Sequence, residues 1–325
     1  MTTSSHSRRH PDQRFKTITI PCIFNLSGKR HLTVTVYVDD LMILSDNVRT
    51  IDWLLTELTT RYDQLKITRG MNHNYLGMIF DLSEPPFILI NRQGMIEDII
   101  SSTKTGVPIQ IPTLGPRSLL RHQLHHISTR TRQDLLTTIS LLSKRVLHPT
   151  QEDWDKLQRA LGYLENTKTQ NLKLGMTIPP TIRTYIDASF AVHSDYKSHT
   201  GICISLGVGV YYAKSTAQKI NTSCQAEMVA LAKGLQQSII SAYFLDGRGH
   251  PIPQIIVNQD SQSTIKLISN ERLNSELTRH IQISYYWFKD LIDRGLITVV
   301  YGPIENMIDD CFTKPLEGTL FNHMR

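Results

Sequence analysis

The sequence lacks the features that mark membrane-embedded, secreted and disulfide-stapled proteins. No apolar run approaches the roughly 20 residues that a bilayer-spanning helix needs. Residues 1–14 are polar and basic, so they contain no secretory signal and are expected to be disordered. The four cysteines (Cys22, Cys203, Cys224 and Cys311) form no CxxC pair. Their scatter argues against a zinc knuckle or a disulfide framework and suits a reducing compartment.

Positive charge is concentrated in one part of the chain. The 325 residues carry a net charge of +6, but residues 179–325 contain 13 Lys+Arg and 13 Asp+Glu, so the excess lies upstream. A basic segment spans residues 101–148, where Asp134 is the only acid. Such a segment is typical of a protein that holds a phosphate backbone, although a solvated helix surface is the alternative. The candidate nucleic-acid contacts are Arg117, Arg121, Arg130, Arg132, Lys144 and Arg145.

Hydrophobic periodicity divides the first half into a β-rich part and a helical part. Strands are predicted within residues 16–24, 32–38, 41–44, 75–82 and 87–91. Helices are predicted at residues 50–62, 93–101, 132–147 and 151–165. Residues 102–116 contain three prolines and two glycines and are predicted to be a linker. Thr150 and Asp153 predict a capping box at the start of the last helix.

The second half shows three consecutive strands followed by alternating helices and strands. The predicted strands are residues 183–187, 201–205, 208–214, 255–259 and 297–301. The predicted helices are residues 223–238, 261–269, 275–294 and 304–313. This order predicts a mixed five-stranded sheet flanked by helices.

Four acidic residues stand at positions where this second half would bring them together. Asp187 and Asp260 each end an apolar strand, where open sheets place their sites. Glu227 lies on a helix with a capping box at Thr222, and Asp310 lies on a helix between two prolines. Such acids would repel each other without cations, whereas two Mg²⁺ or Mn²⁺ ions roughly 4 Å apart would make them a phosphodiester hydrolysis site. The alternative for any single acid is an exposed or strand-capping residue.

Six motifs in this half resemble the ribonuclease H (RNase H) domain of Ty1/copia-type retrotransposon polyproteins. They are residues 185–191, 198–201, 226–231, 259–263, 278–281 and 305–316. The resemblance implies that Asp187, Glu227, Asp260 and Asp310 bind the metals that cut RNA in an RNA–DNA hybrid. Asp310 is chosen over its neighbour because the family usually has a small residue at that neighbouring position. His280 matches a family histidine that would contact substrate phosphate or assist product release; a helix-surface histidine is the alternative.

The first half contains a second pair of acids, Asp39 and Asp40, between two apolar strands. An exposed Asp-Asp turn is one interpretation, but with Tyr37 the motif resembles the catalytic hairpin of a reverse-transcriptase palm, in which these aspartates hold the polymerase metals. Residues 74–77 and 88–93 resemble segments that position the primer. The family's third carboxylate lies well upstream, whereas Asp12 is the only acid before this hairpin here. The resemblance therefore implies a truncated palm without polymerase activity of its own.

Together these patterns predict an α+β or α/β chain in four parts. They are a disordered start (1–14), a truncated reverse-transcriptase palm with an antiparallel sheet and helices (15–101), a basic helical thumb or connection (102–178) and an RNase H-like domain (179–325). The predicted function is two-metal hydrolysis of RNA in RNA–DNA hybrids, with template-primer nucleic acid and other parts of a Gag-Pol polyprotein as partners. The implied location is a cytoplasmic virus-like particle or the nucleus. The alternatives are a non-catalytic transposon relic that only binds nucleic acid, and an unrelated cellular nuclease of the same fold.

Overall fold

The computed structural model divides the chain into two compact units, which are described separately. One unit is built from residues 1–70 and 241–252, and the other from residues 71–240 and 253–325. The residues that the structure describes are 15–17, 23–26, 32–62, 64–104, 114–146, 148–189, 196–218, 223–251, 254–269, 279–302 and 310–314.

The first unit contains an antiparallel sheet, one complete helix and residues 241–247 of helix α6 (Ser223–Gly247). The strands follow the order β1-β2-β3-β4, and their bounds are β1 Phe15–Thr17, β2 Ile23–Leu26, β3 Leu32–Tyr37 and β4 Asp40–Ser45. Helix α1 spans Val48–Arg61 and begins where the Asn47 side chain accepts a hydrogen bond from the backbone N–H of Arg49. Leu32 and Val34 of β3 are buried, and Leu54 of α1 packs against them. This packing holds the β3–β4 hairpin in place.

The second unit begins with a small antiparallel sheet of order β11-β8-β7-β6-β5. Its strands are β5 Asn72–Tyr75, β6 Met78–Asp81, β7 Ile88–Asn91, β8 Leu172–Met176 and β11 Gly207–Val208. The single strand predicted over residues 75–82 is wrong, because Leu76 and Gly77 adopt positive φ angles of 53° and 69° and form a turn between β5 and β6. Leu174 of β8 pairs with Ile88 of β7, so the small sheet joins segments far apart in the sequence.

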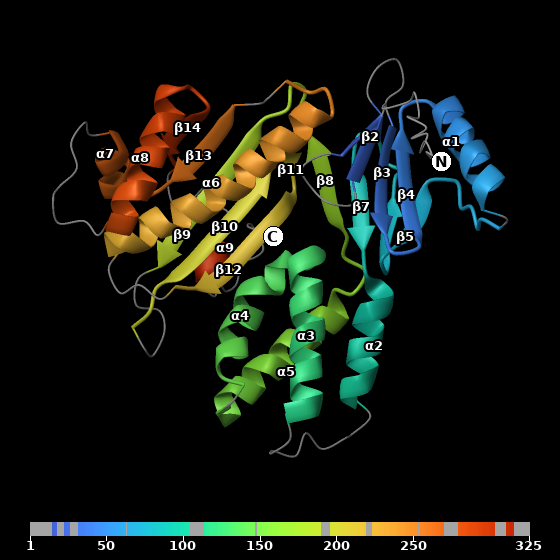
Figure 1. The fold of residues 1–325 in the computed structure, drawn as a ribbon. Helices are drawn as coiled ribbons and strands as arrows, with labels where there is room; N and C mark the ends of the chain where they lie inside the picture. Colours follow the sequence, from blue (N-terminus) through green and yellow to red (C-terminus); the bar gives the residue numbers. More distant parts are fainter. Residues whose placement is uncertain are drawn as a thin grey trace, which may run out of the picture. The chain divides into compact units, whose positions relative to one another are not determined.

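A helical region lies between β7 and β8 along the chain (Figure 1). Its elements are α2 Gln93–Lys104, α3 Leu114–Arg130, the 3₁₀ turn η1 Gln133–Leu135, α4 Leu136–Lys144 and α5 Gln151–Asn166. Side chains from all four α-helices share one core that includes Ile99, Leu124, Ile139 and Leu164. The predicted capping box at the start of α5 is confirmed. Helix α3 was not predicted, and it begins inside the segment expected to be a linker.

The larger sheet of the second unit is mixed and has the order β12-β10-β9-β13-β14. Its strands are β9 Ile182–Ser189, β10 His199–Ser205, β12 Val210–Ala217, β13 Ile255–Gln259 and β14 Ile297–Tyr301. Strand β13 runs parallel to β9 and β14, whereas β10 runs antiparallel to β9 and β12. The helices of this part are α6 Ser223–Gly247, α7 Gln262–Ser269, α8 Arg279–Asp293 and α9 Asp310–Thr313. None of the described helices is long and apolar enough to cross a membrane.

Helix α6 lies across one face of this sheet (Figure 1). The approach is close at Gly234, where a Cβ atom would stand 2.5 Å from Cδ1 of Ile186 on β9. One turn later, the Ser238 hydroxyl lies 2.6 Å from the Thr184 hydroxyl, and both groups are buried. The missing side chain at Gly234 therefore sets the distance between α6 and β9.

We expect Gly234→Ala to destabilise the protein by about 1–3 kcal/mol, because the added methyl overpacks the interface between α6 and β9. Gly162→Ala on α5 is the matched control, since a Cβ there meets no heavy atom of the described residues within 4 Å. That change should be neutral or stabilising by up to about 1 kcal/mol, because alanine favours helix. Urea unfolding measures both, and equal stability of the two variants would refute the packing argument.

A candidate metal centre

Three of the four acids predicted from the sequence are brought together by three different elements. Asp187 is the sixth residue of β9, Glu227 lies in the second turn of α6, and Asp260 follows the last residue of β13. In the parallel register of β9 and β13, Asn258 pairs with Tyr185. Two residues further along both strands, this register brings Asp260 beside Asp187.

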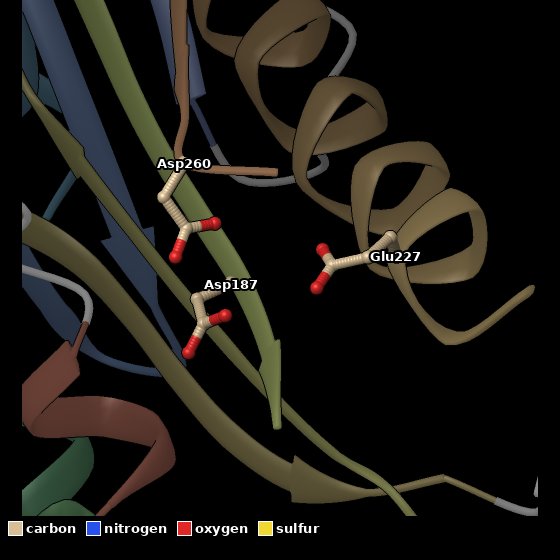
Figure 2. A group of neighbouring side chains, drawn as sticks. All are labelled: Asp187, Glu227 and Asp260. Carbon is tan, nitrogen blue, oxygen red and sulfur yellow. The ribbon is translucent and has the colours of Figure 1, made fainter. Parts of the chain in front are cut away.

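The three carboxylates point toward one another (Figure 2). Each offers one oxygen atom, and these atoms all lie within 4.8 Å of one another. Asp187 is 5% exposed and Glu227 6% exposed, while Asp260 is partly buried. Of all the described residues, these alone form such a group of three or more potential metal ligands.

The environment of the cluster shifts the pKa of Glu227. Burial raises the pKa of the Glu227 carboxyl, and the neighbouring charge of Asp187 and then of Asp260 adds to the shift. Hydrogen bonds from Gln259 and from the backbone N–H of Ala188 act in the opposite direction. The pKa nevertheless rises to about 8, so without a cation Glu227 is largely protonated at neutral pH.

Two neutral side chains that the sequence analysis missed donate hydrogen bonds to the cluster. Gln259 Nε2 donates to Glu227 Oε2 at 2.8 Å, and Thr313 Oγ1 donates to Asp187 Oδ2 at 2.6 Å. Both Gln259 and Thr313 are fully buried. Thr313 follows Asp310 by three residues, and residues i and i+3 share a helix face. This spacing is the signal in the sequence that could have placed Thr313 near the acids.

The donor set fits a hard divalent cation. Mg²⁺ and Mn²⁺ take oxygen ligands, and three carboxylates supply them within one small region. The Oε1 atom of Gln259 is buried beside Glu227 and has no hydrogen-bond partner among the described atoms, which is unusual for a native interior. A cation would also offset the burial and the neighbouring negative charge that raise the pKa of Glu227.

The predicted fourth ligand and the predicted histidine stay predictions. The side chains of Asp310 and His280 lie outside the described residues, although their backbones do not. Asp310 is the first residue of α9, three residues before Thr313, which contacts Asp187. His280 is the second residue of α8.

The second pair of acids occupies a different environment. Tyr37 pairs with Asp40 across the β3–β4 hairpin, whose turn is formed by Val38 and Asp39. Val38 has a φ of 54°, a rare conformation for a β-branched residue, and is 84% exposed. Both aspartates are exposed, and no third acid, histidine or cysteine of the described chain completes a ligand group with them.

One of the six predicted nucleic-acid contacts, Arg132, is buried. Arg132 is 1% exposed, and its guanidinium makes a bidentate ion pair with Asp134, at 3.1 Å from Nε and 2.7 Å from Nη2. It also donates to the Thr167 carbonyl and hydroxyl, and it lies 5.3 Å from the ring centroid of Tyr163. With these donors used internally, Arg132 stabilises the start of α4 and is not available to a phosphate group.

The remaining basic residues differ in exposure. Arg130 and Lys144 are exposed, and Arg121 is partly buried. Arg145 is half-exposed and forms an ion pair with Asp153, with 3.3 Å between Nη1 and Oδ1. The side chain of the sixth, Arg117, lies outside the described residues.

The two segments that resemble primer-positioning motifs are in contact. Arg92, in the second segment, is nearly buried and donates to the carbonyls of Leu76 and Gly77 in the first, at 2.9 and 3.2 Å. Arg92 Nη1 also lies 3.3 Å from His126 Nδ1 on α3. Burial and the charge of Arg130 lower the pKa of Arg92, and burial followed by these two arginines lowers the pKa of His126. Positive charge therefore gathers at this end of α3.

A cavity of about 350 Å³ lies elsewhere in the second unit. It is enclosed by α3, α4 and α5, and Leu124, Ile139 and Trp154 are among its lining residues. None of the three clustered carboxylates lines it.

Comparison with known proteins gives consistent relatives, although no protein-family model matches the chain. It is 25% identical over 336 residues to the retrovirus-related Pol polyprotein from transposon TNT 1-94 of Nicotiana tabacum, covering 94% of this chain and 25% of that protein. It is 26% identical to the Pol polyprotein from transposon RE1 of Arabidopsis thaliana, covering 91% and 21%. The transposon Ty1-BR Gag-Pol polyprotein of Saccharomyces cerevisiae is 22% identical, with 91% and 19% covered. The chain thus spans a quarter or less of the length of these relatives.

Two solved structures share the fold. The foamy viral protease-reverse transcriptase in complex with an RNA/DNA hybrid has a TM-score of 0.57 and 14% identity, covering 88% of this chain and 37% of that chain. The foamy viral protease-reverse transcriptase dRH in complex with double-stranded DNA has a TM-score of 0.53 and 14% identity, covering 83% and 46%. At this identity the likeness concerns the fold alone. Together with the antiparallel and mixed sheets, it confirms the predicted fold class.

The raised pKa of Glu227 predicts how stability depends on pH in the absence of divalent cations. The folded protein favours the protonated carboxyl of Glu227. The stability that this group contributes is therefore fully present below its ordinary pKa of 4.5 and is lost as the pH rises through about 8. Within that window, the unfolding free energy of the wild type should fall by up to roughly 1.4 kcal/mol per pH unit relative to Glu227→Gln. Urea unfolding in EDTA at several pH values measures the difference. Parallel pH profiles for the two proteins would contradict this assignment.

Proposed function

Because the chain is homologous to the Pol polyproteins of Ty1/copia-type retrotransposons, we propose that residues 179–325 form an RNase H domain that cuts the RNA strand of RNA–DNA hybrids. The observation that carries this proposal is the group of three carboxylates whose ligand atoms lie within 4.8 Å of one another. Oxygen ligands gathered in this way are typical of sites that hydrolyse phosphodiesters with divalent metals.

The residues of the site take distinct roles in this proposal. Asp187, Glu227 and Asp260 hold the cations, and Asp310 is the proposed fourth ligand. Two bound Mg²⁺ or Mn²⁺ ions supply activation of a water molecule and stabilisation of the leaving oxygen. Glu227 gives up its proton on binding, because a carboxylate coordinates metal in its ionised form. His280 is proposed to contact a substrate phosphate or to assist product release.

Nucleic acid is proposed to be held by the basic helical region, residues 102–178. The exposed charges of Arg130 and Lys144 and the partly buried Arg121 support this role. Contacts of this kind bind without sequence preference and weaken steeply with salt.

The proposal extends to the rest of the chain by homology. Residues 15–101 are proposed to be part of a reverse-transcriptase palm, with Tyr37, Asp39 and Asp40 as its polymerase motif. Template-primer nucleic acid and other parts of a Gag-Pol polyprotein are the proposed partners. The proposed place of action is a virus-like particle in the cytoplasm, or the nucleus.

The nuclease proposal predicts Mg²⁺- or Mn²⁺-dependent cleavage of a labelled RNA–DNA hybrid by the purified chain. Asp187→Asn, Glu227→Gln and Asp260→Asn should each lower the rate about 1000-fold, because losing a ligand removes several kcal/mol of transition-state stabilisation. Asp155→Asn is the matched control, since Asp155 is exposed on α5 and accepts a hydrogen bond from Gln151. It should cleave like the wild type.

Three outcomes of this assay are informative. Cleavage that survives Asp187→Asn would point to a contaminating nuclease. A wild-type chain that binds the hybrid but does not cut it would favour the alternative function, a relic that only binds nucleic acid. Loss of cleavage in Asp155→Asn as well would indicate that the substitutions act through folding.

The exposed hairpin predicts no DNA synthesis by this chain alone. Asp39 and Asp40 have no third ligand among the described residues, and two carboxylates should hold a pair of metal ions poorly. We expect no primer extension on a poly(rA) template with an oligo(dT) primer, measured in the protein preparation that is active in hybrid cleavage. Extension that disappears in Asp39→Asn would contradict this prediction.

A further inference from the structure

Thr313 is placed to control the orientation of Asp187. Its Oγ1 atom donates a 2.6 Å hydrogen bond to Asp187 Oδ2, whereas the nearby Ser189 hydroxyl lies 3.5 Å from the same oxygen. Thr313 is 0% exposed and Asp187 is 5% exposed, so water cannot readily replace this donor. A short bond of a hydroxyl to a carboxylate is among the stronger hydrogen bonds in proteins.

The backbone that carries Thr313 is fixed by packing on its neighbours. Phe312, the preceding residue of α9, is buried in one cluster with Cys203 and Ala213 of the mixed sheet and Leu136 of α4. Helix α4 is itself tied to the sheet, where the Ser140 hydroxyl donates to the carbonyl of Ser215 at 2.9 Å. The position of the Thr313 hydroxyl is therefore set by the packing of Phe312 on the sheet and on α4.

The two faces of the sheet contribute one buried donor each. Ile186 of β9 faces α6, so the next residue, Asp187, faces the opposite side, where α9 lies. Gln259 donates to Glu227, whereas Thr313 donates to Asp187. Each donor engages one oxygen of its acid, which restricts rotation of the carboxylate.

We propose that Thr313 is a positioning residue for the candidate metal centre: its hydroxyl holds the Asp187 carboxylate in the orientation that binds divalent cations. This inference rests on the proposed function. Thr313 does not contact the cation or the substrate. It acts as outer partners of metal ligands commonly do, and loss of such partners typically lowers metal affinity 10- to 100-fold.

The test compares Mn²⁺ affinity, measured by isothermal titration calorimetry on the full chain, in variants with and without the hydroxyl. Thr313→Val keeps the shape of the side chain, and Thr313→Ala removes the hydroxyl without adding a methyl group; each should bind about 10-fold more weakly. Thr313→Ser retains the donor and should bind within about 3-fold of the wild type. Thr184→Val is the matched control, since Thr184 is equally buried and loses a 2.6 Å hydrogen bond to Ser238.

Affinity, rather than stability, separates positioning from structural support. Thr184→Val should lower the unfolding temperature but leave Mn²⁺ affinity unchanged, because its hydroxyl touches none of the acids. If Thr313→Val or Thr313→Ala binds Mn²⁺ like the wild type, or if Thr313→Ser binds as weakly as they do, the inference is wrong. A wild type that binds no Mn²⁺, with the same calorimetric trace as Asp187→Asn, overturns the proposed function and the inference with it.

Discussion

The mutual repulsion of three acidic side chains is the constraint on which the rest of the second unit depends. Their nearest oxygen atoms lie within 4.8 Å of one another, and Asp187 and Glu227 are buried. Charges this close and this poorly solvated are costly, so the isolated site responds by raising the pKa of Glu227 to about 8. A fold that keeps these carboxylates together must place each of them on a rigid element, because a carboxylate on a mobile element would move into solvent.

The architecture supplies that rigidity from both faces of one strand. Because Gly234 has no side chain, α6 packs closely against β9, and this packing sets the distance of Glu227 from the sheet. On the other face, α9 brings Thr313 to Asp187, while the buried Phe312 holds α9 in place. The acids therefore meet at the edge where two parallel strands end and a helix begins, and no single element determines their geometry.

The sequence predicted elements well where the pattern is local and poorly where it depends on a distant partner. Strands β13 and β14 have the predicted bounds, because both are short runs rich in β-branched residues, which favour strands. The sequence does not predict helix α3, because the prolines and glycines of residues 102–116 indicate a linker. Proline is nevertheless tolerated in the first turn of a helix, where Pro116 lies. Strand β8 exists through its pairing with β7, and Arg132 donates hydrogen bonds to Thr167, 35 positions away. Such distant partners are not visible in local composition.

The two acidic motifs of this chain also show why residue type alone does not define a metal site. Asp39 and Asp40 lie on an exposed hairpin, where water can solvate their side chains. Asp187 and Glu227 lie where water is excluded, so a proton or a metal ion must balance their charge. The buried cluster is therefore the one whose protonation and metal binding compete directly, and burial, which the sequence could not reveal, makes this difference between two otherwise similar motifs.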